Sequence, residues 1–173
     1  MSEPYPLEQL VLIKQKKLEE AEKNLREKKR LLEEEENKLR AVEKERDKVK
    51  DHRFAKLTQL REKMDEGAPS DKIQQMRYYL KEVDQQLAQK EVKVVDQKKR
   101  VEAAQRNVEL ARLDLLKKQQ DVEKLRMHRE EWEKEMKAIA AQKEGVETDE
   151  MGSALHNRKT RGHAKKPKKN KNN

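Results

Sequence analysis

Histidines are the residues here with the side chains best suited to metal or acid–base chemistry, but their positions suit neither. The chain contains four histidines and no cysteine. His52 and His128 fall in different predicted helices and far apart along them, while His156 and His163 lie near the C-terminus without metal-ligand spacing. The absence of cysteine excludes a disulfide, a thiolate zinc site and a thiol nucleophile. We therefore expect no catalytic residue and no metal site.

Carboxylates and glycines give no stronger signal for catalysis. The acidic run at 33–36 sits on a predicted helix surface, where a solvated face explains it better than an acid–base pair does. No glycine-rich phosphate loop is present, so any involvement with ATP would come through a partner. We expect a protein that is not an enzyme, with no cofactor and no small-molecule substrate.

Composition limits the fold to an extended helical one or to disorder. Of 173 residues, 46% are charged and only 32% are hydrophobic, too few for a compact core of this length. A pair of long helices needs only one apolar stripe on each, so periodicity decides between helices and disorder. The longest apolar run, 10–13, is too short to enter a membrane, and we expect a cytoplasmic protein.

The net charge of +9 comes from the C-terminal end. Residues 158–173 contain eight lysines or arginines and no acid, which leaves 36 basic against 35 acidic residues in 1–157. Apolar periodicity fails after Gly145, and Gly152, Gly162 and Pro167 follow. We therefore expect residues 147–173 to form a disordered basic tail. The tail lacks aromatic residues for stacking, so nucleic acid is not the expected partner and is kept as an alternative.

A heptad pattern predicts two long helices. Over about 71–146, a positions recur every seven residues from 73 and d positions every seven residues from 76. Of these 22 positions 17 are apolar, and Lys90 and Gln97 are among the polar ones; eleven such heptads are typical of a left-handed coiled-coil seam. Over about 7–65 the pattern is less perfect. One row runs every seven residues from Val11 to Leu60 and is interrupted by Arg46 and Arg53, and a second row runs every seven residues from Leu7 to Lys56 with charged residues at half of its positions. Near residue 65 the stripe is expected to drift onto Phe54, Leu57, Leu60 and Met64.

A short connection at 66–70 predicts that the two helices lie antiparallel. Gly67 suits the left-handed position that ends a helix, Pro69 prevents continuation, and Ser70 or Asp71 can cap the next helix. The predicted fold is all-α: a long antiparallel two-helix coiled-coil hairpin after an extended segment at 1–6. A symmetric turn pairs residues whose numbers add to about 136, so helix 2 continues past the start of helix 1.

This pairing predicts an exposed apolar surface near the chain's N-terminus. Tyr5 should lie close to Trp132, and Leu12 and Ile13 should point away from the seam. We take the candidate partner-binding residues to be Tyr5, Leu12, Ile13, Trp132, Met136 and Ile139. They can form a local plug that closes the open end, a docking surface for another protein, or both.

Several segments resemble the YscO/FliJ family of coiled-coil stalk proteins of type III secretion and flagellar export. They are YPLEQLVLIK at 5–14, ERDKVK at 45–50, HREEW at 128–132 and DEMG at 149–152. The resemblance spans most of 4–155 and is strongest to the chlamydial YscO-like proteins. The long basic tail is not part of the family pattern.

The resemblance implies a fold similar to the antiparallel helices of the rotary ATP synthase gamma subunit. It implies that the terminal end enters the pore of a hexameric secretion ATPase, while the opposite part faces the export gate protein or carries chaperone contacts. From the residues alone, two alternatives stay open: a nucleic-acid-associated coiled coil acting through its tail, and a purely structural spacer.

Overall fold

Two helices make up the chain in a computed structural model, which describes residues 4–163 and the side chains of residues 4–160. Helix α1 runs over Glu8–Asp65 and α2 over Ser70–His163, with no strand in the described range, so the predicted all-α helical hairpin is confirmed. The helices start within one residue of the predicted positions. Contacts divide the chain into two units: unit 2 spans Lys14–Gln120, and the described part of unit 1 consists of residues 4–13 and 121–163.

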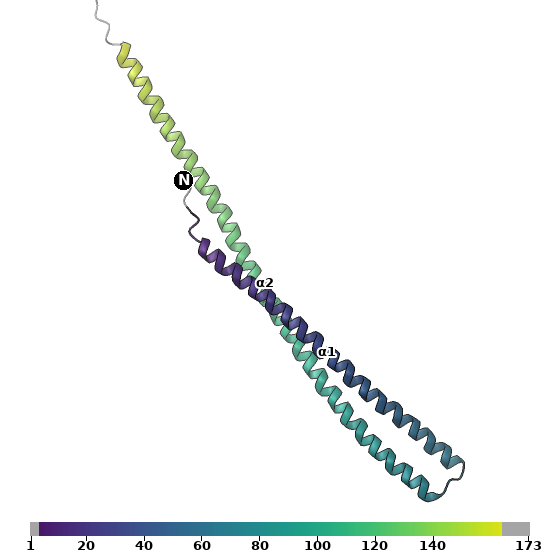
Figure 1. Ribbon diagram of the computed structural model, residues 1–173. Helices are drawn as coiled ribbons and strands as arrows, with labels where there is room; N and C mark the ends of the chain where they lie inside the picture. Colours follow the sequence, from purple (N-terminus) through teal and green to yellow (C-terminus); the bar gives the residue numbers. More distant parts are fainter. Residues whose placement is uncertain (1–3, 164–173) are drawn as a thin grey trace, which may run out of the picture. The chain divides into compact units, whose positions relative to one another are not determined.

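The turn between the helices is a glycine-dependent helix end. Gly67 has a φ of 74°, its amide donates to the Met64 carbonyl at 3.1 Å, and the Ala68 amide donates to the Lys63 carbonyl at 3.0 Å. This pair of bonds is the Schellman arrangement, which satisfies carbonyls that the ending helix leaves free. In unit 2 the two helices leave this turn side by side and antiparallel (Figure 1).

The start of α2 differs from the predicted cap. The Pro69 carbonyl accepts the first helical hydrogen bond, from the Ile73 amide at 3.2 Å, so Ser70 is already the first helical residue. Asp71 lies in the first turn, where its charge complements the positive end of the helix dipole. Pro69 is therefore the N-cap residue, and its carbonyl also accepts from the Lys72 amide at 3.1 Å, so neither Ser70 nor Asp71 holds the capping position.

The predicted seam is confirmed in unit 2. Every residue of α2 between 70 and 120 that is not exposed occupies a predicted a or d position, and Val83, Val94, Val101, Val108 and Ala111 are the most deeply buried. Both predicted rows of α1 are also covered, including their charged members. The drift predicted near the turn is wrong at two positions, since Phe54 is 70% exposed and Met64 is 47% exposed. The seven-residue register continues instead through Arg53, Lys56 and Leu60.

Polar side chains help to fix the pairing in unit 2. Gln97 is buried at a d position, and its Nε2 donates to the Glu35 carbonyl at 3.1 Å and to the Glu35 carboxylate at 2.5 Å. Arg53 pairs with Asp84, and their numbers add to 137. A buried amide with a single partner across a coiled coil specifies one register at some cost in stability.

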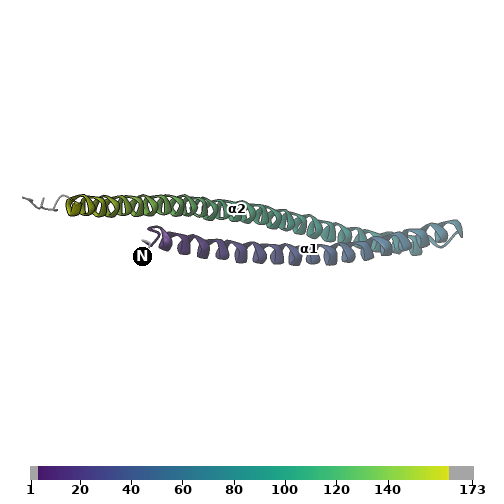
Figure 2. The same ribbon diagram turned by 90° about the horizontal axis from the view of Figure 1, so that it is seen from above.

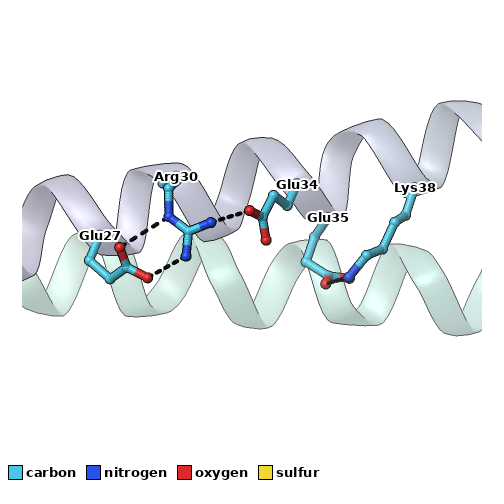
Figure 3. A network of polar contacts seen from close by, with 5 residues as sticks. All are labelled: Glu27, Arg30, Glu34, Glu35 and Lys38. Atoms are coloured by element: carbon cyan, nitrogen blue, oxygen red, sulfur yellow. Dashed lines mark hydrogen bonds and ion pairs between the residues drawn. The ribbon is translucent and has the colours of Figure 1, made fainter.

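Charged residues of α1 also pair along the helix, as Figure 3 shows. Arg30 donates to the Glu27 carboxylate, with Nη2 at 2.5 Å, and also pairs with Glu34 one turn later. The hydrogen bond from Arg30 lowers the pKa of Glu27, and the bond from Lys38, at 2.6 Å, contributes most to lowering the pKa of Glu35. Such exposed pairs each add only tenths of a kcal/mol to helix stability.

In unit 1, α2 continues far beyond its predicted end. The prediction of a disordered tail is wrong for residues 147–163, which are helical. Because they extend an existing helix, they need no new nucleus, and Gly152 costs only about 1 kcal/mol relative to alanine. Thr148 donates its hydroxyl proton to the Glu144 carbonyl at 2.8 Å. The apolar row stops near Gly145, and the helix continues without it because each added residue only propagates an existing helix.

The rest of the predicted tail, residues 164–173, lies outside the described residues. Neither described helix holds a stretch apolar enough to cross a bilayer.

Candidate partner-binding site

Tyr5 is the centre of a cluster in unit 1. It precedes α1, and its carbonyl accepts a hydrogen bond from the Glu8 amide at 3.2 Å, which ties it to the first turn. Its side chain is only 6% exposed although it belongs to no helix. The predicted closeness to Trp132 is confirmed: the two ring centroids lie 5.5 Å apart in an edge-to-face arrangement. Tyr5 therefore holds the extended segment against α2.

Two further residues of α2 hold Tyr5 in place. The Tyr5 hydroxyl lies 2.7 Å from Nδ1 of His128, and the two groups share a hydrogen bond. The guanidinium of Arg129 lies 5.6 Å from the centre of the Tyr5 ring, within range of a cation–π interaction. Arg129 also forms an ion pair with Glu8 at 3.0 Å, which joins α1 to α2. We call Tyr5, His128, Arg129 and Trp132 the tyrosine cluster.

A groove of about 890 Å³ lies next to the tyrosine cluster. Its apolar lining comes from Pro4, Tyr5, Trp132, Met136, Ile139 and Ala140, and its charged rim from Arg129, Glu133, Lys137 and Lys143. Trp132 and Met136 are partly covered, whereas Ile139 is 42% exposed. An apolar floor with a charged rim has the character of a protein-binding surface, with cationic groups in excess at the rim.

Four of the six predicted site residues meet in this groove, and two do not. Tyr5, Trp132, Met136 and Ile139 line it. Leu12 and Ile13 are 58% and 52% exposed on α1, facing away from the seam as predicted, and are not part of the groove lining. The predicted surface therefore divides into a groove and a separate apolar pair, which we call the Leu12/Ile13 pair.

Heptad spacing alone predicted no role for His128 or Arg129. His128 was considered only as a metal ligand or catalyst, and Arg129 falls at one of the five polar a and d positions of the predicted seam. The pairing rule could have predicted the ion pair between Arg129 and Glu8, since the two residues have opposite charges and their numbers add to 137. In the described part of the chain, no three acidic or histidine side chains gather closely enough to hold a metal ion. The tyrosine cluster and the groove beside it are therefore suited to binding another protein by surface contact.

A second aromatic contact lies in unit 2. His52 Nε2 is 2.9 Å from the Tyr79 hydroxyl, and the Lys56 ammonium lies 5.7 Å from the centre of the same ring. Lys56 and Tyr79 also line a shallow hollow near the turn, and Tyr79 is 43% exposed. The contact links α1 to α2 on the surface of unit 2.

Comparisons with known proteins identify the family. The family model described as "YscO-like protein" matches residues 2–162. A solved structure of a YscO homolog, CT670 from Chlamydia trachomatis, is 46% identical, with a TM-score of 0.89 over 92% of this chain and 98% of that chain. A search of curated proteins gave no match. The match to the family model covers nearly the whole chain, and the chain therefore belongs to the YscO-like family of type III secretion-associated proteins.

Proposed function

We propose that this protein is the non-enzymatic central stalk of a type III secretion system, acting in the cytoplasm on the hexameric secretion ATPase. Unit 1 would enter the pore of the ATPase ring, and the region around the turn would contact the export gate protein or chaperones. The observation that carries the proposal is the groove beside the tyrosine cluster, where apolar side chains remain accessible on a long helix.

The groove has the composition expected of a binding centre. Aromatic and arginine side chains dominate the binding energy of protein interfaces, and here Tyr5, Trp132 and Arg129 are held in fixed contact before any partner arrives. Preorganised side chains lose little conformational freedom on binding. Ile139 and Met136 beside them offer apolar surface that a partner can cover. A small apolar patch of this kind suits reversible binding of the stalk to the ATPase ring.

The helical extension supports the same role. In unit 1, every residue of α2 from 137 to 160 is exposed. All faces of this stretch are therefore accessible to another protein. Figure 2 shows α2 continuing beyond the start of α1 in this unit. A helix without an intramolecular partner can contact several subunits of a surrounding ring. Such contacts would favour one conformation of each subunit over another and so couple the stalk to ATP hydrolysis.

The test is a titration of the purified protein into the secretion ATPase of the same organism, with hydrolysis rate and oligomer size followed together. We expect saturable binding to the hexamer and a changed turnover. Ile139→Ser combined with Met136→Ser should weaken binding by about tenfold or more, because two apolar anchors of the groove are lost. A second variant, Leu12→Ser with Ile13→Ser, tests the Leu12/Ile13 pair separately.

A matched control comes from unit 2. Phe54 is 70% exposed on α1 and belongs to neither predicted surface, so Phe54→Ser should leave ATPase binding unchanged. Circular dichroism checks that all variants keep their helices. The stalk proposal fails if the wild-type protein neither binds the ATPase nor alters its turnover. It also fails in its placement of the site if both double variants bind like wild type.

A further inference from the structure

Helix α2 carries a second apolar stripe in unit 2, on the side opposite the seam. Val92, Val95, Leu110 and Leu113 are between 51% and 64% exposed, and Ala103 lies between them. At about 100° per residue, these five side chains fall within an arc of about 80° centred opposite the buried Val94–Val101–Val108 row. We call this surface the outer stripe. No segment among the described residues covers it.

The outer stripe also contains a hollow. A shallow hollow of about 460 Å³ lies over Leu110 and Leu113 and is bordered by Glu102, Arg106 and Glu109. Leu116, half exposed, extends the apolar surface at its edge. Spaced apolar anchors on one helix face are what a second amphipathic helix packs against.

The charges along the middle of the outer stripe are all positive. Lys99, Arg106 and Lys117 share its arc, and within the described residues none of the three forms an ion pair. Two of the bordering acids are engaged: Arg112 pairs with Glu109 at 2.6 Å, and Lys118 pairs with Asp114 at 3.7 Å. Glu91, Asp96 and Glu102 border the outer stripe without an ion pair among the described residues, and none of them lies along its middle. The centre of the outer stripe therefore calls for negative charge in a partner.

The sequence of the outer stripe argues against a second copy of this chain. On the outer face, residues 91–114 form a partial palindrome of side-chain types: Glu91 matches Asp114, Val92 matches Leu113, Val95 matches Leu110, Asp96 matches Glu109, and Lys99 matches Arg106. Two copies packed antiparallel with their apolar residues in register would therefore place like charges opposite each other at every charged match. Two parallel copies in register would do the same. Like charges facing each other across helices are destabilising, so neither symmetric pairing is favourable.

We infer that the outer stripe is a docking surface for an acidic amphipathic helix of another protein. Such a helix would place leucine-type residues over Val92, Val95, Leu110 and Leu113, and carboxylates seven residues apart opposite Lys99 and Arg106. Residues 91–114 span about 36 Å of helix, which sets the length of the partner segment. Because of the palindrome, the partner segment can lie in either direction with similar contacts. The outer stripe lies wholly in unit 2 and is separate from the groove and the Leu12/Ile13 pair.

Two synthetic helices of about 25 residues, of the length the outer stripe requires, test this inference. Both carry the same leucine face, flanked by glutamates in one peptide and by lysines in the other, and anisotropy of a dye label reports binding. The glutamate peptide should bind the full-length protein saturably and the lysine peptide should not. Leu110→Ser with Leu113→Ser should weaken binding of the glutamate peptide by about tenfold or more. Lys99→Glu with Arg106→Glu should reverse the preference between the two peptides.

The controls separate docking from unfolding and from self-association. All four substituted side chains are surface residues, so the variants should keep the helicity and thermal midpoint of the wild type. Phe54→Ser, on the other helix, should bind the glutamate peptide as the wild type does. The inference is overturned if both peptides bind equally, or if the leucine and charge variants bind unchanged. It is also overturned if sedimentation shows a wild-type dimer that Leu110→Ser with Leu113→Ser dissociates, because the outer stripe would then be covered by a second copy.

Discussion

Replacing Tyr5 by alanine should release the extended N-terminal segment from α2. Tyr5 is 6% exposed, and burying an aromatic side chain of this kind contributes about 3 kcal/mol. Its hydrogen bond to His128, at 2.7 Å, contributes about 1 kcal/mol of net stability. Since 1.4 kcal/mol corresponds to tenfold, Tyr5→Phe should raise the open population about fivefold and Tyr5→Ala about 100-fold or more. The segment lies at a terminus, so opening stays local and the helices remain paired.

The assay uses the single tryptophan of the chain. Trp132 contacts the Tyr5 ring, so its fluorescence reports whether the segment is docked. Tyr5→Ala should shift the emission to longer wavelength and increase quenching by acrylamide, Tyr5→Phe should do so slightly, and Tyr78→Ala, at a 61% exposed position in unit 2, should do neither. Unchanged quenching in Tyr5→Ala would refute the docking of Tyr5 on Trp132.

Three further outcomes follow from the packing and the charges. Gln97→Leu should raise the thermal midpoint, because a buried amide in the seam is replaced by an apolar side chain; a lower midpoint would show that its bond to Glu35 outweighs that gain. Gly67→Ala should lower the free energy of unfolding by about 1 kcal/mol in a denaturant titration, since the φ of 74° strains any residue with a Cβ, although the space around Gly67 is open. Arg30 lowers the pKa of Glu27 below 4.5, so their pairing stabilises the fold above pH 4.5 and is lost as the pH falls through the lowered pKa. The thermal midpoint should therefore decline on acidification below pH 4.5, and a midpoint that rises instead would contradict this reasoning.

Heptad spacing made most of the fold predictable, because the same positions that carry apolar side chains also face the partner helix. It even located Gln97 and Lys90 as covered positions, since geometry places a d residue at the seam whatever its polarity. The end of α2 was less predictable. Loss of the heptad pattern after Gly145 marks the end of the apolar seam, but a helix that has no partner needs no such seam. Propagation of an existing helix needs no new nucleus, and this carries α2 through Gly152 despite the low helix propensity of glycine.

Residue pairing across the turn predicted the neighbourhood of the groove but not its details. The pairing rule placed Tyr5 near Trp132, because the constant rise per residue puts the two at nearly equal distances from the turn along their helices. It could not foresee that His128 meets the Tyr5 hydroxyl, since that contact depends on how the segment before α1 bends at Pro6. The outer stripe could not be predicted from the heptad pattern, because that pattern concerns only the a and d positions, while Val92, Leu110 and Leu113 occupy the outer face.

The stoichiometry of the complex with the secretion ATPase tests the stalk proposal most directly. Mass measurement of the ATPase hexamer, alone and saturated with this protein, gives the number of copies bound. A stalk seated in the pore predicts one copy per hexamer, with binding lost when Met136 and Ile139 are both replaced by serine. Six copies per hexamer, or no complex at all, would contradict a central stalk.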